Sequence, residues 1–522
     1  MLTNVLQGDA HAVAVEGTEN WVKTFFMPVS ESEFRDMRRQ VYQALEGANE
    51  SLSSPWNDLL FSDLRFVDHL ISFLYAEIIR ERCKASGTRI VTSPGALSPF
   101  AAHWRDRGDD FSDLSKPTTF RRARQVRRRF LHCSYLPLFR RAVGSLRQSP
   151  VWSLGAIHRP KREYLAQYGL LCDFPSLKGM VAAKHTTVPG GERQARSIIH
   201  DALANLDRTL GETFGVRIDV PGIVDVWLRR LKALHPAYES MRQNASGCSR
   251  LLVAGTGNAV IRATALGAKK ADLTVTGFFH AHQAGYTKER EFCYTELGVC
   301  DEYVCATEKA AESLTDLARQ FPLTRDNNIE FVPQKTMYYR SLWEQHHGRN
   351  ITTESDTVMV VGFPMNGIRY SYGVGLFDLL RLDFEIRLAK LLKARGIRVL
   401  YKPHPETRGI MRGLMGPYVD CVVMEPLEQV YAKGGTLLFT HPFTSTFGFS
   451  LCTGANIVIL DAIGTIWTPA IRNLLEDRCA FVPMDFDDRG RLRVDDEVLI
   501  EAIGKAPGKN DYRYVHEYLI HS

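Results

Sequence analysis

The sequence is poor in the features that mark specialised classes of protein. None of its ten cysteines belongs to a Cys-x-x-Cys pair, so the usual spacing of zinc ligands is absent. No apolar run reaches the roughly eighteen residues that span a bilayer, and residues 1–20 lack the basic and apolar regions of a secretory signal. We therefore expect a cytoplasmic protein with reduced thiols.

The sequence also has little excess of positive over negative charge. The net charge is +6 over 522 residues, which is too small to indicate nucleic acid as a partner, and we expect none. The stretch Arg121–Arg129 is the exception, with six arginines in nine positions. We interpret it as a solvated helix face; the alternative is peripheral contact with an anionic membrane surface or an acidic glycan.

The composition is that of an ordinary globular protein, and strand and helix patterns alternate along part of the sequence. Hydrophobic residues make up 45% and charged residues 24%, as is typical of soluble domains. Residues 1–85 carry apolar side chains at helical spacing. From about residue 250 onward, short strand patterns alternate with helices, which indicates parallel βαβ units.

These units fall into two series and predict two domains. The strand patterns of the first series are 251–254, 272–279, 303–306 and 329–332. Those of the second are 357–361, 398–402, 421–424, 436–440, 456–461 and 479–483. The fold class we predict is α/β, with two Rossmann-like domains facing a cleft and an N-terminal helical elaboration.

The domain boundaries follow from these series. Residues 1–245 hold the helical elaboration plus part of the N-terminal Rossmann-like domain, and residues 246–340 hold the remainder of that domain, on the acceptor side. Residues 341–355 are polar and without period, and we expect a linker there. Residues 356–522 form the C-terminal Rossmann-like domain, on the donor side. Its last helix, either 498–504 or 512–520, is expected to pack back across the linker.

One stretch of the second series combines a strand end with ionisable side chains. The strand pattern stops at Lys402-Pro-His-Pro405, because proline cannot donate to a sheet ladder. His404 is therefore expected at the carboxyl end of a strand, where open α/β sheets bind ligands. Lys402 and Glu406 flank it, and together they suit a phosphate and a sugar. A simple strand-terminating turn is the alternative.

A second stretch follows the strand pattern 436–440. Thr444, Ser445 and Thr446 stand where the next helix is expected to begin. Hydroxyl groups and free backbone N–H groups at such a position can bind an anion. A single hydroxyl there would indicate only an ordinary helix cap, but three in a row after a strand favour phosphate binding.

Other candidates lie in loops that follow strands. In the glycine-rich loop 362–375, Asn366 and Arg369 can hold a phosphate or an acidic acceptor, although a plain flexible loop has the same composition. Glu425 follows the third strand of the C-terminal series. It can bind a ribose or sugar hydroxyl, or it can simply be an acidic residue at a helix N-terminus.

The N-terminal domain offers candidates for proton transfer. His280 and His282 follow the strand pattern 272–279, and an imidazole has a suitable pKa for a general base. We prefer His282 slightly; two ordinary loop histidines are the alternative. The acids Asp301 and Glu302 are further candidates for activating an acceptor hydroxyl or attacking the sugar. No third ligand at telling spacing accompanies the histidines, so we expect no metal.

The two C-terminal stretches resemble motifs of known enzymes. Lys402-Pro-His-Pro405 resembles the His-Pro motif of bacterial GT-B transferases with cytidine-activated donors, which include capsule-type Kdo transferases, sialyltransferases and CDP-glycerol glycerophosphotransferases. Thr444-Ser-Thr446 resembles their Ser/Ser or Ser/Thr pair. The resemblance implies a GT-B fold, and it implies that His404, Ser445 and Thr446 contact the donor phosphate and cytidine.

The implied function is transfer of a sugar from a CMP-linked donor, such as CMP-Kdo or a sialic-acid relative, to a bacterial surface-glycan acceptor. The expected partners are a nucleotide-sugar donor and a glycan or lipid-linked acceptor, at the inner membrane or free in the cytoplasm. No cofactor is expected, because side chains can neutralise the leaving phosphate. The alternatives are CDP-glycerol-type phosphotransfer, a nucleotide-sugar epimerase, and a non-catalytic glycan- or lipid-binding protein.

Overall fold

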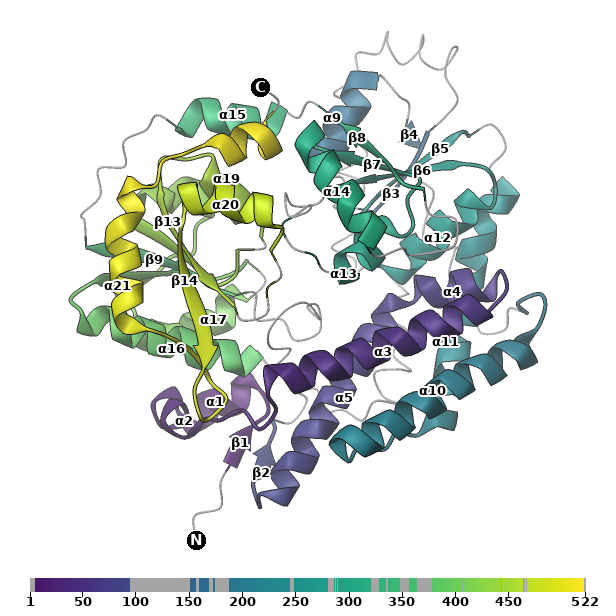
Figure 1. The fold of residues 1–522 in the computed structure, drawn as a ribbon, viewed down its shortest axis with the longest axis horizontal. Helices are drawn as coiled ribbons and strands as arrows, with labels where there is room; N and C mark the ends of the chain where they lie inside the picture. The colour runs from purple at the N-terminus through teal and green to yellow at the C-terminus, as the bar shows by residue number, and fades with distance from the viewer. Residues whose placement is uncertain are drawn as a thin grey trace.

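The protein has two α/β domains and a layer of helices beneath them (Figure 1). The computed structural model describes residues 5–93, 151–155, 159–168, 172–173, 187–244, 248–279, 286, 288, 290–320, 328–334, 337–347, 356–363, 378–405, 407–442, 444–462, 465 and 467–520. In this part of the chain, no helix is long and apolar enough to cross a membrane.

The helical layer comes from two separate stretches of the chain. The first contains the strands β1 (Val5–Gln7) and β2 (Arg89–Val91), which pair in parallel, and the helices α1 (Ala10–Glu16), α2 (Thr18–Thr24), α3 (Glu31–Ser51), α4 (Trp56–Ser62) and α5 (Leu64–Ala85). The second contains α10 (Glu192–Phe214) and α11 (Val220–Asn244). Ser30 and Glu33 form a capping box that begins α3.

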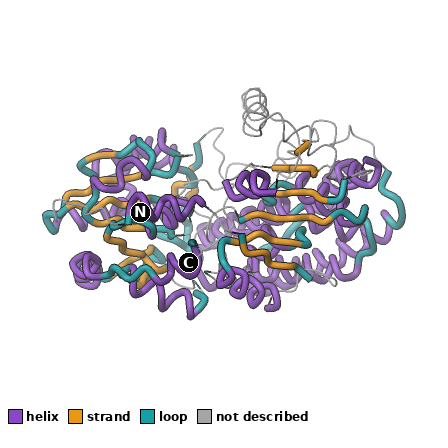
Figure 2. Tube along the Cα trace, turned by 90° about the horizontal axis from the view of Figure 1, so that it is seen from above, coloured by secondary structure: helices purple, strands orange, loops and turns teal. Residues whose placement is uncertain are grey.

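The N-terminal domain has a six-stranded parallel sheet in the order β4-β3-β5-β6-β7-β8. Its strands are β3 (Val151–Gly155), β4 (Cys172–Asp173), β5 (Arg250–Ala254), β6 (Thr274–Phe278), β7 (Glu302–Cys305) and β8 (Glu330–Pro333). Its helices are α9 (Arg159–Tyr168), α12 (Ala259–Lys269), α13 (Arg290–Phe292), the π-helix η3 (Cys293–Leu297) and α14 (Glu308–Gln320). Figure 2 shows the strands of the two sheets enclosed by helices.

The C-terminal domain has a seven-stranded sheet in the order β11-β10-β9-β12-β13-β14-β15. The strands are β9 (Thr357–Val361), β10 (Arg398–Lys402), β11 (Cys421–Val422), β12 (Thr436–Phe439), β13 (Asn456–Asp461), β14 (Ala480–Phe486) and β15 (Leu492–Val494). The helices are α16 (Asp378–Ala394), α17 (Arg408–Met415), α18 (Leu427–Val430), α19 (Ser445–Leu451), α20 (Pro469–Arg478), α21 (Asp496–Lys505) and η7 (Val515–Leu519). Among the strands that the structure describes in this sheet, only β15 is antiparallel to its neighbour.

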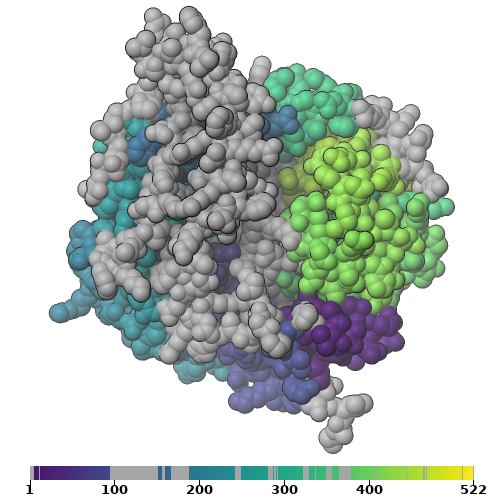
Figure 3. Space-filling view, turned by 180° about the vertical axis from the view of Figure 1, so that it is seen from behind, coloured from purple at the N-terminus to yellow at the C-terminus, as the bar shows by residue number. Residues whose placement is uncertain are grey.

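The ends of the chain tie the two domains together. Helix η7 packs against α14 of the N-terminal domain, which confirms that the last helix packs back across the linker. At the other end, α2 packs on α16, and Met27 N–H donates to Arg489 O at 2.8 Å. Figure 3 shows these N-terminal residues, in purple, against the green C-terminal domain.

The predicted fold class is confirmed, since the two sheets of an α/β protein and a helical elaboration are all present. Two features differ from the expectation. Helix α15 (Met337–His346) occupies the start of the expected linker, where Trp343 packs on the ring of Tyr512 at 4.7 Å. The antiparallel edge strand β15 was not expected, because its three residues are too few to show a period.

Candidate functional site

The strand order of the C-terminal sheet defines where a ligand can bind. The chain runs from β9 to β10 and β11 in one direction, and β12 to β14 lie on the other side of β9. Such a switch in direction opens a crevice at the carboxyl ends of the two central strands. Here these strands are β9 and β12, which pair in parallel. The crevice therefore lies next to Phe363 and His441, and His404 follows the neighbouring strand β10.

A buried carboxyl group joins the three strand ends. Glu385 of α16 accepts hydrogen bonds from Phe363 N–H at 2.7 Å, from Tyr401 Oη at 2.6 Å and from Thr440 Oγ1 at 2.8 Å. Tyr401 belongs to β10, Thr440 follows β12 directly, and Phe363 stands two residues after the end of β9. Burial raises the pKa of Glu385, and the three donors oppose that shift. Glu385 thus holds the floor of the crevice in one geometry.

A buried arginine lies one helical turn before this carboxyl group. The side chain of Arg381 is 2% exposed. Its guanidinium carbon lies 5.0 Å from the ring centre of Phe363, and its Nη1 donates to Thr440 O at 3.4 Å. Burial lowers the pKa of Arg381 to about 10, while Glu31 and Glu385 act in the opposite direction. Arg381 therefore remains a cation at neutral pH.

His441 is a second basic group at these strand ends. Burial, then Arg381 and then His404 lower the pKa of His441 to about 3, so its imidazole is neutral at physiological pH. The ring of His441 lies 5.1 Å from that of Phe363. An anion bound here would be stabilised by the cation of Arg381 beside this neutral ring.

Lys402 is the third basic group at this edge. It is 4% exposed, and its Nζ donates to Pro403 O at 3.0 Å. Burial and Arg408 lower its pKa, and two carboxylates raise it, those of Glu428 and Glu425. Burying an ammonium group is costly, which favours a negatively charged ligand close to it.

The hydroxyl stretch lies at the same edge of the sheet. Thr444 precedes α19, and its Oγ1 lies 2.7 Å from Thr446 Oγ1. Ser445 is exposed and Thr446 is half-buried. Thr444 does not cap the helix with its side chain, so these hydroxyl groups do not serve the ordinary capping role. The structure therefore brings Thr444, Ser445 and Thr446 to the edge that carries His441.

The other residues predicted to form the site lie further from these strand ends or outside the described part of the chain. Glu425 follows β11, is exposed, and lies 3.4 Å from Lys433 Nζ. Asp301 and Glu302 lie at the start of β7, which is the amino edge of the N-terminal sheet. Asp301 pairs with Lys269 at 2.9 Å and Glu302 pairs with Arg250. The structure does not bring these two acids to the carboxyl edge. The following lie outside the described residues: His280, His282, Asn366, Arg369, Glu406 and Arg121–Arg129.

Sequence reasoning missed Arg381, Glu385 and Glu296. The first two stand four residues apart in a helix that is buried nearly all round. Charged residues in such a helix are the signal that could have found them.

Glu296 lies in the N-terminal domain and belongs to the π-helix η3, a geometry frequent at functional sites. Burial raises its pKa to about 7, and Arg262 opposes the shift. No periodicity in the sequence marks this segment.

The chain is an α/β protein with two largely parallel sheets, and this arrangement resembles the GT-B fold. No family model and no curated protein sequence matches the chain. Distant matches exist among solved structures of GT-B-fold enzymes, and they show no specific family.

Three of these structures are as follows. UDP-N-acetylglucosamine 2-epimerase from Rickettsia bellii is 12% identical, over 54% of this chain and 71% of that one, with a TM-score of 0.34. UDP-GlcNAc 2-epimerase from Methanocaldococcus jannaschii, in complex with UDP-GlcNAc and UDP, is 13% identical over 54% and 80%, with a TM-score of 0.33. HepE from Anabaena, in complex with UDP and glucose, is 7% identical over 71% and 93%, with a TM-score of 0.32. At these values the likeness carries no argument about function.

Proposed function

We propose that the protein is a glycosyltransferase that transfers a sugar from a cytidine-activated donor to a surface-glycan acceptor. The observation that carries the proposal is the set of basic groups at the switch point of the C-terminal sheet. His441 lies within electrostatic range of Arg381 and His404, and the buried Lys402 ends the strand that precedes His404. A nucleotide phosphate is expected at these strand ends. The resemblance of the His-Pro and hydroxyl motifs supports cytidine as the base and a keto-acid sugar as the transferred group.

Each group has a role in this reaction. The acceptor oxygen forms a bond to the anomeric carbon, and the bond from that carbon to the phosphate oxygen breaks, with its electron pair left on CMP. Lys402 and His404 offset the charge that develops on the phosphate, and Ser445 and Thr446 donate hydrogen bonds to the nucleotide. The acceptor proton passes to a base of the N-terminal domain, which we assign to His282 or His280.

Thermal stabilisation by nucleotides tests the proposal. A ligand that binds only the folded state at a hundred times its Kd adds about 2.7 kcal/mol of stability. We expect CMP to raise the melting temperature in the absence of metal ions, and we expect His404→Ala to abolish the shift. His200→Ala is the matched control, because His200 is an exposed histidine on α10 of the helical layer.

The other nucleotides separate the alternatives. A response to CDP alone would replace sugar transfer by transfer of a phosphoalditol. A response to UDP, GDP or ADP but not to CMP would overturn the cytidine donor. No response to any of the five, or a CMP shift that His404→Ala leaves unchanged, would overturn the proposed site.

A further inference from the structure

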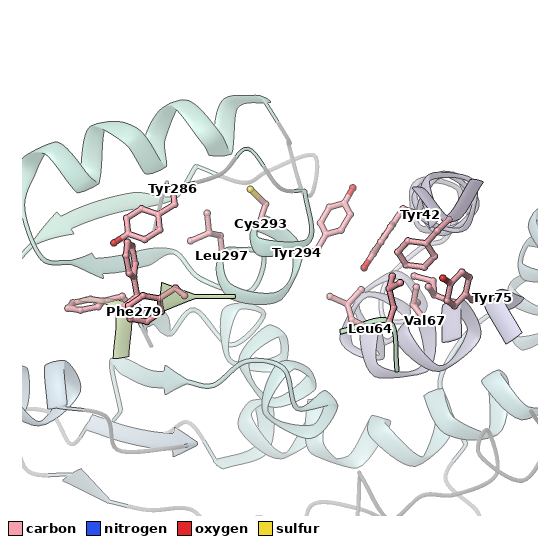
Figure 4. Close-up of a cluster of buried hydrophobic side chains, with 14 of the residues drawn as sticks. Tyr42, Leu64, Val67, Tyr75, Phe279, Tyr286, Cys293, Tyr294 and Leu297 are labelled. Atoms are coloured by element: carbon pink, nitrogen blue, oxygen red, sulfur yellow. The ribbon is translucent and has the colours of Figure 1, made fainter. Parts of the chain in front are cut away.

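Tyr286 of the N-terminal domain makes its closest described contacts with the C-terminal domain. It lies between β6 and α13 in the sequence, and its side chain is 0% exposed. Its backbone oxygen accepts a hydrogen bond from Thr468 N–H at 2.8 Å, and Thr468 directly precedes α20. Figure 4 shows Tyr286 in one cluster of buried side chains with Phe279, which directly follows β6. A connection of the N-terminal domain thus reaches the C-terminal domain.

Three aromatic rings of the C-terminal domain contact the ring of Tyr286. The distances between ring centres are 5.5 Å to Tyr514, 6.2 Å to Phe447 and 6.4 Å to Trp467. Aromatic pairs are favourable at such separations. Tyr514 directly precedes η7, which packs against α14, whereas Phe447 belongs to α19. Tyr286 therefore contacts separate segments of the C-terminal domain at once.

Phe447 connects this contact to the hydroxyl stretch. It directly follows Thr446 in α19, and its ring packs both on Tyr286 and, at 5.2 Å, on Phe439 of β12. Phe447 N–H donates to Thr444 O at 3.1 Å. Thr444 Oγ1 lies 2.7 Å from Thr446 Oγ1. The placement of the Phe447 ring therefore affects where the two threonine hydroxyl groups lie.

We propose that Tyr286 is a positioning residue, which holds α19 from the N-terminal domain so that the hydroxyl groups of Thr444–Thr446 keep the geometry that binds a nucleotide phosphate. The inference rests on the proposed function for the identity of the ligand, whereas the contacts of Tyr286 do not depend on it. Nucleotide binding and the docking of the two domains then stabilise each other, because such a coupling is reciprocal.

Hydrogen exchange and nucleotide binding in variants of the 522-residue chain test this inference. The test variant is Tyr286→Leu, which removes the ring and keeps an apolar side chain. Tyr303→Leu is the matched control, because Tyr303 is a buried tyrosine of the same domain that packs on Phe331 of β8. Mass spectrometry measures the exchange of the α19 amides without ligand, and calorimetry measures the binding of CMP.

We expect faster exchange of α19 in Tyr286→Leu. One aromatic pair changes an equilibrium constant by about two- to tenfold. Because Tyr286 contacts several rings, we expect CMP binding to weaken by about tenfold. Tyr286→Phe keeps the ring and should stay close to the wild type in both measurements, as should Tyr303→Leu.

The other outcomes overturn the inference or separate it from the proposed function. Equal changes in Tyr286→Leu and Tyr303→Leu would indicate a general loss of stability and overturn the positioning role. Unchanged exchange of α19, or faster exchange with unchanged CMP affinity, would overturn it too. If the wild type binds no CMP, the proposed function fails. Faster exchange in Tyr286→Leu would then still support the hold on α19, and unchanged exchange would refute it.

Thr468→Pro is a second test, which applies even if Tyr286→Leu does not fold. Thr468 has a φ of −70°, which proline adopts, and its side chain makes no capping hydrogen bond. The substitution removes the N–H group that donates to Tyr286 O. We expect faster exchange of α19 in this variant, and exchange at the wild-type rate would overturn the inference.

Discussion

Replacing Tyr401 by phenylalanine would test the internal support of the phosphate crevice. The side chain of Tyr401 is fully buried, and its hydroxyl donates to Glu385 Oε2 at 2.6 Å. The substitution leaves that carboxyl oxygen buried without its donor, at a cost of about 1–3 kcal/mol. Phe363 and Thr440 bond to the other oxygen, Oε1, so Glu385 stays anchored on one side only. We expect a loss of about 2 kcal/mol and weaker nucleotide binding.

Urea unfolding followed by circular dichroism would measure the loss of stability, and calorimetry with CMP would measure the binding. Tyr303→Phe is the matched control. Tyr303 is 1% exposed, lies in β7 of the other sheet, and has no hydrogen bond to a carboxyl group in the described part of the chain. Equal unfolding midpoints for the two variants would refute the stated role of the Tyr401 hydroxyl. If the Tyr401→Phe variant bound CMP with unchanged affinity, Glu385 would support the fold but not the binding of the nucleotide.

Three further predictions concern stability. Gly267→Ala should cost about 3 kcal/mol in a thermal melt, because its Cβ would lie 1.9 Å from a backbone carbonyl oxygen of α11, whereas Gly504→Ala meets nothing within 4 Å and should be neutral or stabilising. Asp63→Asn should cost about 3–5 kcal/mol in urea, because Arg230 and Asp63 pair at 2.8 Å with both side chains fully buried. Burial raises the pKa of Glu296 to about 7 from 4.5, so the stability tied to its proton is present below pH 4.5 and is lost as the pH rises through 7. Glu296→Gln should therefore be more stable than the wild type at pH 8 by about 2–3 kcal/mol and should lose that advantage at pH 4.5; an equal difference at both pH values would contradict the assignment.

The elements that the sequence predicted best are those with the strongest local pattern. The predicted bounds of β9, β10 and β13 agree with the structure residue for residue. Strands buried on both faces appear as continuous apolar runs. The prolines around His404 also placed that residue after a strand from local information alone.

The sequence by itself thus determined the α/β class, the two series of strands and the strand ends that carry His404 and Thr444. Only the tertiary structure decided that β12 lies beside β9, which turns His441 into a neighbour of the first strand end. It also decided that Glu385 reaches three strand ends at once and that α3 brings Glu31 to Arg381. The physical reason is the distance along the chain over which each kind of interaction acts. Periodicity and turn chemistry act over a few residues, whereas strand order and the burial of charged side chains depend on contacts between segments that the sequence leaves far apart.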